Sequence, residues 1–183
     1  MIHLSKLRYS GRRRAIGSYP AILVSLFLTV VLAAGPVAAA KAGAETGLPI
    51  PRFVSLRADK ANLRAGPGLR YPIEWVYKRQ KLPLLILDEF EAWRKIRASD
   101  GTTGWMHSVM LSGARTLRVT GPGPRVLRED PASTAAPVAR LAPGVIGELE
   151  DCEPAFCYID AGRVEGWLRR DSFFGALPRE GTE

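Results

Sequence analysis

From residue 53 onwards, the hydrophobic positions of this chain fall into short runs separated by glycine, proline and charged residues. Leu82 to Leu87 is one apolar run, and residues 72–77 alternate apolar and polar side chains as far as Trp75. Runs this short, bounded by turn residues, are typical of β-strands. Further strands are expected at residues 61–64, 92–97, 104–107, 125–128, 138–141 and 145–149, around Phe156 and Ile159, and from Gly166. No amphipathic helix is predicted in this region, so the sequence predicts an all-β fold.

The β pattern occurs twice. Asn62-Leu63-Arg64-Ala65-Gly66-Pro67-Gly68 precedes Gly104-Trp105, and Val126-Leu127-Arg128-Glu129-Asp130-Pro131 precedes Gly166-Trp167. Leu127 follows Leu63 by 64 residues, and Trp167 follows Trp105 by 62. Two copies of one small unit, each with about five strands, are therefore predicted. Units of this size with Gly and Pro turns form small barrels or sandwiches.

The pattern divides the chain into five parts. These are a signal peptide and processing region at 1–44, a linker at 45–52, a first barrel at 53–113, a second barrel at 114–176 and a C-terminal tail at 177–183. Pro49 and Pro51 favour an extended linker.

The first forty residues have the layout of a secretory signal. A start rich in Lys and Arg precedes an apolar stretch from Ala21 to Ala34, and two A-x-A sites follow at Ala38–Ala40 and Ala42–Ala44. The alternative is an uncleaved anchor, but the apolar run is shorter than the roughly 20 residues that span a bilayer. We predict a periplasmic or secreted protein with no stable membrane anchor after cleavage. Arg12-Arg13 leaves open whether export is Sec-dependent or twin-arginine-dependent.

Removal of the signal changes the meaning of the net charge. The whole chain carries +8, but cleavage after Ala44 would leave +2. A nucleic-acid partner is therefore not predicted. Residues 53–113 carry +4 and residues 114–176 carry −1. A basic first unit would favour anionic partners, although a solvated charged surface accounts for the same residues.

Cys152 and Cys157 are the only cysteines, and four residues separate them. An even number in an exported chain predicts a disulfide, here across a hairpin. A redox-active pair is the alternative, but that chemistry favours a C-x-x-C spacing at a helix start.

The motifs resemble those of the bacterial SH3-like family, in its exported tandem form. The resemblance rests on residues 62–68, Tyr71-Pro72, Trp93 and Gly101 through Gly104-Trp105. It implies a barrel of five or six strands in each copy and a binding role that is often directed at the cell wall. The second copy departs from the pattern, because Glu129-Asp130 replace Ala65-Gly66 and no aromatic residue matches Trp75. Whether the second copy binds anything therefore stays open.

Aromatic residues of the first unit are the candidate binding residues, because aromatic rings can stack on sugars or hold extended peptides. We predict binding residues at Tyr71, Trp75, Tyr77, Trp93 and Arg64. Arg64 and its match Arg128 could bind a carboxylate or brace the adjacent turn. The tryptophans of the two Gly-Trp pairs are expected to be structural.

No catalytic residue, metal site or cofactor is predicted. His107 is the only histidine after the signal region, and Asp88, Glu89 and Glu91 are interpreted as a solvated hairpin tip. A cysteine hydrolase using Cys157 and His107 is the enzymatic alternative.

We therefore predict a non-enzymatic envelope protein that binds a wall peptide, a glycan or an exported partner protein. A scaffolding subunit of an envelope complex, using an exposed barrel edge, is the alternative. The ligand, the partner and the oligomeric state are not determined by the sequence.

Overall fold

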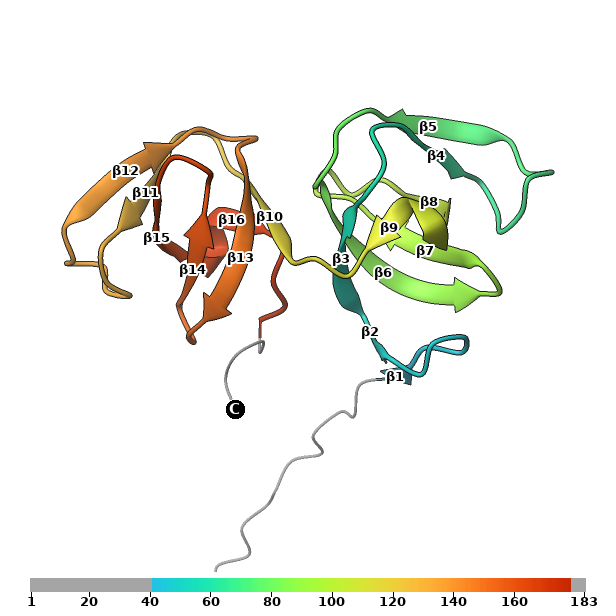
Figure 1. Cartoon of the computed structure of the whole chain (residues 1–183), viewed down its shortest axis with the longest axis horizontal. Coiled ribbons are helices and arrows are strands. Elements are labelled where there is room, and N and C mark those ends of the chain that lie inside the picture. The colour runs from blue at the N-terminus through green and yellow to red at the C-terminus, as the bar shows by residue number, and fades with distance from the viewer. Residues whose placement is uncertain (1–40, 179–183) are drawn as a thin grey trace, which may run out of the picture. The chain divides into compact units, whose positions relative to one another are not determined.

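The computed structural model describes residues 41–178, which form sixteen short strands and two 3-10 turns. Most strands belong to two antiparallel sheets of seven strands each (Figure 1). The predicted all-β fold class is confirmed. The predicted signal peptide lies almost entirely outside the described residues.

The first barrel is the sheet with strand order β5-β4-β8-β7-β6-β3-β9. Its elements are β3 (Arg52–Leu56), β4 (Ala61–Arg64), β5 (Ile73–Tyr77), β6 (Pro83–Phe90), β7 (Trp93–Arg97), β8 (Thr103–His107), η1 (Ser108–Met110) and β9 (Leu111–Ser112). Its core consists of alternate side chains from these strands, among them Leu63, Ile86, Ile96 and Met106. The β5 strand forms one free edge of the sheet.

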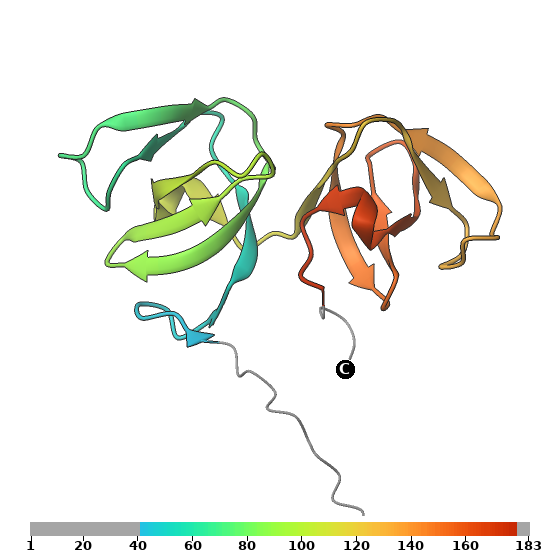
Figure 2. The same ribbon diagram turned by 180° about the vertical axis from the view of Figure 1, so that it is seen from behind.

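The second barrel is the sheet with strand order β12-β11-β15-β14-β13-β10-β16. Its elements are β10 (Thr116–Val119), β11 (Arg125–Arg128), β12 (Pro137–Leu141), β13 (Ile146–Cys152), β14 (Phe156–Asp160), β15 (Glu165–Arg169), η2 (Arg170–Ser172) and β16 (Phe173–Phe174). In the strand order, each of its strands has a counterpart at the same place in the first barrel. Figure 2 shows both sheets from behind. Leu117, Leu127, Ile159 and Leu168 lie in its core.

The glycines of the two Gly-Trp pairs lie where strands cross closely. Arg64 pairs with Trp105 and Arg128 pairs with Trp167. A Cβ at Gly104 would lie 2.9 Å from the Arg64 carbonyl oxygen, and one at Gly166 would lie 2.6 Å from that of Arg128. A side chain at either position would therefore collide with backbone. Trp105 and Trp167 are only half-buried and lie outside both core clusters.

The segment 45–52, predicted to be a linker, contains folded structure. Strands β1 (Lys41–Ala42) and β2 (Pro49–Ile50) form a hairpin, and β3 begins at Arg52. The side chain of Ile50 belongs to the first core. We refer to residues 41–50 as the N-terminal hairpin.

Glu89 holds the N-terminal hairpin against the first barrel. Its position shows that the interpretation of Asp88, Glu89 and Glu91 as a solvated tip was wrong for Glu89. The Glu89 side chain is fully buried. Its carboxylate accepts the backbone N–H groups of Glu45 (3.0 Å) and Thr46 (2.9 Å) and the Thr46 hydroxyl (2.8 Å). Arg52 Nη2 lies 2.6 Å and Arg94 Nε 3.4 Å from Oε1. Glu91 remains exposed at the tip.

These contacts set the protonation of Glu89. Burial alone raises the pKa of its carboxyl, but the hydrogen bonds from Arg52 and Thr46 outweigh burial and lower the pKa to about 2. Glu89 is therefore a buried carboxylate at neutral pH, and it joins the N-terminal hairpin to β3, β6 and β7.

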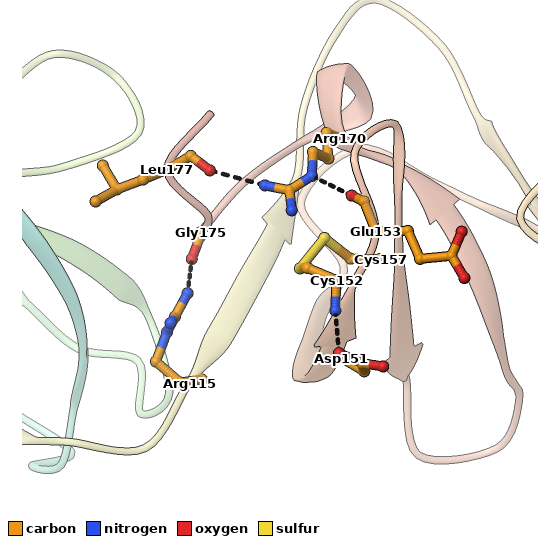
Figure 3. Close-up of a disulfide and its surroundings, with 8 residues drawn as sticks. All are labelled: Arg115, Asp151, Cys152, Glu153, Cys157, Arg170, Gly175 and Leu177. Carbon is orange, nitrogen blue, oxygen red and sulfur yellow. Dashed lines mark hydrogen bonds between the residues drawn. A yellow bond between two sulfur atoms is a disulfide. The ribbon is translucent and has the colours of Figure 1, made fainter. Parts of the chain in front are cut away.

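Cys152 and Cys157 form the predicted disulfide (Figure 3). They face each other in the register of β13 and β14, and the Cys157 side chain lies in the second core. Arg170 binds the tip of this hairpin, since its Nε donates to the Glu153 carbonyl (2.7 Å) and its backbone N–H to that of Ala155 (3.0 Å). The same guanidinium donates through Nη1 to the Leu177 carbonyl (2.7 Å). The disulfide hairpin and the C-terminal segment are therefore joined through one arginine.

Candidate binding site in the first barrel

The β4 strand presents alternate side chains to a surface cavity of the first barrel. Lys60, Asn62 and Arg64 are two residues apart, and successive side chains on a strand point to opposite faces. All three line a cavity of about 340 Å³. We call this cavity the basic pocket; its other lining residues are Leu69, Trp93, His107 and Met110.

Arg64 has a fixed position in this pocket. Its Nη1 donates to the carbonyl oxygens of Tyr71 (2.7 Å) and Leu69 (3.1 Å), which braces the turn between β4 and β5. Within residues 41–178, Nε and Nη2 have no hydrogen-bond partner. The guanidinium is thus both a turn brace and a donor with unused N–H groups.

Trp93 and His107 form the opposite wall. They are paired residues of β7 and β8, and their rings meet edge to face with centroids 5.2 Å apart. The Nδ1 of His107 accepts the Val109 N–H at 3.3 Å, so the neutral ring carries its proton on Nε2. Trp93 is largely buried, so it contributes mainly a surface for apolar contact.

The structure brings only two of the five predicted binding residues, Arg64 and Trp93, into the basic pocket. Trp75 is 54% exposed on the edge strand β5 and does not line the pocket. Tyr71 packs over Gly66, where a Cβ would collide with the Tyr71 ring. Tyr77 is part of the core, and burial raises the pKa of its hydroxyl to about 12.

Sequence reasoning missed Lys60, Asn62, Leu69 and Met110 as pocket residues, and it considered His107 only for catalysis. The alternation of Lys60, Asn62 and Arg64 is a signal that could have identified a shared polar face. Trp93, His107 and Met110 reach the same place only through the pairing of β7 with β8 and the turn η1.

The described residues bear on three other features: a metal site, a membrane-spanning helix and the Cys157–His107 pair. In residues 41–178, no three His, Cys, Asp or Glu side chains lie together in a way that could hold a metal ion. Across that same range there is no helix with the length and hydrophobicity needed to traverse a bilayer. The pair considered for hydrolysis is not assembled, because Cys157 is bonded to Cys152 while His107 belongs to the other sheet.

Residues 57–113 match the model of the bacterial SH3 domain family. This match confirms the expected resemblance for nearly the whole first barrel, and it ends before the second barrel begins. A search of curated proteins found no match to the chain.

Three of the solved structures that match the chain are from Trichomonas vaginalis and Bacillus cereus. NlpC2 from Trichomonas vaginalis has 10% identity and a TM-score of 0.32, over 69% of this chain and 48% of that one. An NlpC/P60 family protein from Bacillus cereus has 13% identity and a TM-score of 0.31, over 68% and 57%. NlpC1 from Trichomonas vaginalis has 12% identity and a TM-score of 0.33, over 73% and 49%. The chain thus spans about half the length of the structures it matches.

This comparison corrects the prediction that the protein is not an enzyme. One of the matched structures is named an NlpC/P60 family protein, and the other two are named NlpC2 and NlpC1. The prediction of a non-enzymatic protein is therefore withdrawn.

Proposed function

Because residues 57–113 match the bacterial SH3 domain family, we propose that the protein is a cell-wall binding module whose first barrel carries the ligand site. The basic pocket supports this proposal. It combines two cations, the exposed Lys60 and the braced Arg64, with the ring of Trp93 in a cavity of the size that small ligands occupy. The disulfide supports an oxidising, exported location, periplasmic or secreted.

Binding to purified wall material tests this function. The protein should co-sediment with isolated sacculi, and Lys60→Glu should reduce the bound fraction at least tenfold because it replaces a pocket cation by an anion. Lys78→Glu is the matched control, since Lys78 is an exposed lysine of the same barrel outside the pocket. Wild-type protein that stays in the supernatant would contradict the proposed function.

A scaffolding role is the second candidate, and a different surface favours it. Ile73 and Trp75 are exposed on β5, the edge strand of the first barrel. Edge strands with exposed apolar side chains can pair with other chains. Crosslinking in cells distinguishes the two roles. A scaffold should crosslink to a single neighbouring protein, and the Trp75→Ser variant should lose that crosslink while still binding sacculi.

A further inference from the structure

The lining of the basic pocket carries one sign of charge. Lys60 and Arg64 are cationic, His107 offers an N–H, and no Asp or Glu lines the cavity. Asn62 of β4 adds an amide between Arg64 on the same strand and Lys60 just before it. Polar groups arranged in this way complement an anion, and a guanidinium with unused N–H groups matches a planar carboxylate.

The position of Arg64 makes it suited to recognition. Its two bonds to the Leu69 and Tyr71 carbonyls already fix the side chain, so a ligand need not order it on binding. A fixed donor discriminates between ligands better than a mobile lysine on an open surface.

The remaining walls are apolar. Leu69, Trp93 and Met110 surround the polar groups, and the cavity of about 340 Å³ lies at the small end of the usual range for ligand pockets, about 300–1,000 Å³. The space fits a chain end with short aliphatic side chains. Leu69 is 78% exposed on its loop, so it can contact a ligand that enters from solvent.

Comparison with the second barrel shows which of these residues have a structural role and which are specific to the pocket. Arg128 keeps the brace, since its Nη1 donates to the Ala135 carbonyl at 2.6 Å. The positions that match Lys60 and Asn62 are Pro124, just before β11, and Val126, in β11. Arg169 matches His107 in the strand register, but its guanidinium is paired with Asp171 at 2.6 Å. The brace therefore occurs in both barrels, whereas the unpaired polar cluster occurs in the first.

We infer that the basic pocket binds the free carboxylate at the end of a short apolar peptide. This inference rests on the function proposed above, which makes the cell wall the source of the peptide. The carboxylate lies against Lys60, Arg64 and His107. The side chain of the terminal residue lies against Trp93 and Met110.

Calorimetric titration of the full protein with N-acetyl-trialanine tests this assignment. The free acid should bind at least ten times more tightly than its C-terminal amide, which lacks the charge. Lys60→Gln and Arg64→Gln should each remove most of that preference. Arg128→Gln is the matched control, because it loses the same kind of brace without touching the pocket. Asn62→Val places the second barrel's own residue in the pocket and should weaken binding without unfolding the barrel.

The outcomes distinguish this assignment from the proposed function. Equal binding of acid and amide, or no peptide binding by a protein that still sediments with sacculi, overturns the carboxylate assignment and leaves the wall-binding module intact. Tight binding of the acid without sacculus binding supports the assignment and contradicts the module. Inorganic phosphate that binds as tightly as the peptide acid would reassign the pocket to oxyanions in general and overturn the preference for a peptide end.

Discussion

Glu89→Gln is expected to destabilise the first barrel by about 3 kcal/mol at neutral pH. The substitution keeps the shape of the side chain but removes the charge that Arg52 and Arg94 face. Breaking a buried ion pair from one side leaves the partner charges uncompensated, which costs about 3–5 kcal/mol. The lowering of the Glu89 pKa from 4.5 to about 2 corresponds to about 3 kcal/mol by linkage.

The effect should depend on pH in a defined direction. Since the folded-state pKa lies below the unfolded value of 4.5, the unfolded chain takes up protons first as the solution is acidified. The stability that Glu89 contributes is therefore complete above pH 4.5 and is lost as the pH falls towards 2. The difference between wild type and Glu89→Gln should be largest at neutral pH and should narrow at pH 3.

Urea unfolding followed by tryptophan fluorescence measures this difference. Trp75, Trp93 and Trp105 lie in the first barrel, so the signal reports mainly on that barrel. Glu91→Gln is the control, because Glu91 is an exposed carboxylate two residues away. A Glu89→Gln protein as stable as the Glu91→Gln control at pH 7 would show that the buried network does not hold the hairpin.

Removal of the disulfide by the double substitution Cys152→Ala and Cys157→Ala should destabilise the second barrel by about 2 kcal/mol. On the chain-entropy model a cross-link over so short a loop contributes about this much. The hairpin tip should also become more mobile, because the cross-link at its base is lost and only the bonds from Arg170 to the Glu153 and Ala155 carbonyls still hold it. Figure 3 shows this arrangement, in which Arg170 also donates a hydrogen bond to the Leu177 carbonyl.

Hydrogen exchange measures the effect with an internal control. Exchange should quicken in residues 146–160 and around Arg170, while strands β3 to β9 of the first barrel should keep the protection they have in the wild type. Reduction of the wild-type protein should reproduce the pattern. Equal loss of protection in both barrels would mean that the disulfide acts on the whole chain, contrary to its place in one hairpin.

Strands bounded by strong turns could be predicted from the sequence. The predicted strands at 61–64 and 125–128 coincide with β4 and β11, and the disulfide follows from the spacing of two cysteines. The strands β3 and β10 were not predicted, although all four residues from Phe53 to Leu56 are buried. Their partners in the sheet are β6 and β9, or β13 and β16, which lie far along the chain. Local pattern carries no information about such pairing.

The candidate site was only partly predictable for the same reason. Arg64 and Trp93 belong to motifs with recognisable neighbours, and both line the basic pocket. Tyr77 was selected because it is aromatic, yet its strand turns it into the core. Lys60 belongs to no motif, and Asn62 was used only as part of the 62–68 motif; both residues become pocket residues only because the fold brings them near Trp93 and His107.

The sequence by itself determined that this chain is built from short strands in two similar units. Glycine and proline end strands locally, and the alternation of apolar and polar side chains along a strand can be recognised in the sequence. The tertiary structure decided which charged side chains are buried. Glu89 sits among acidic neighbours in the sequence, and only the folding of residues 41–50 against β6 and the approach of Arg52 and Arg94 make it a buried carboxylate. The basic pocket likewise exists only where β4, β7 and η1 meet, since proximity across a sheet is a property of strand pairing and not of sequence distance.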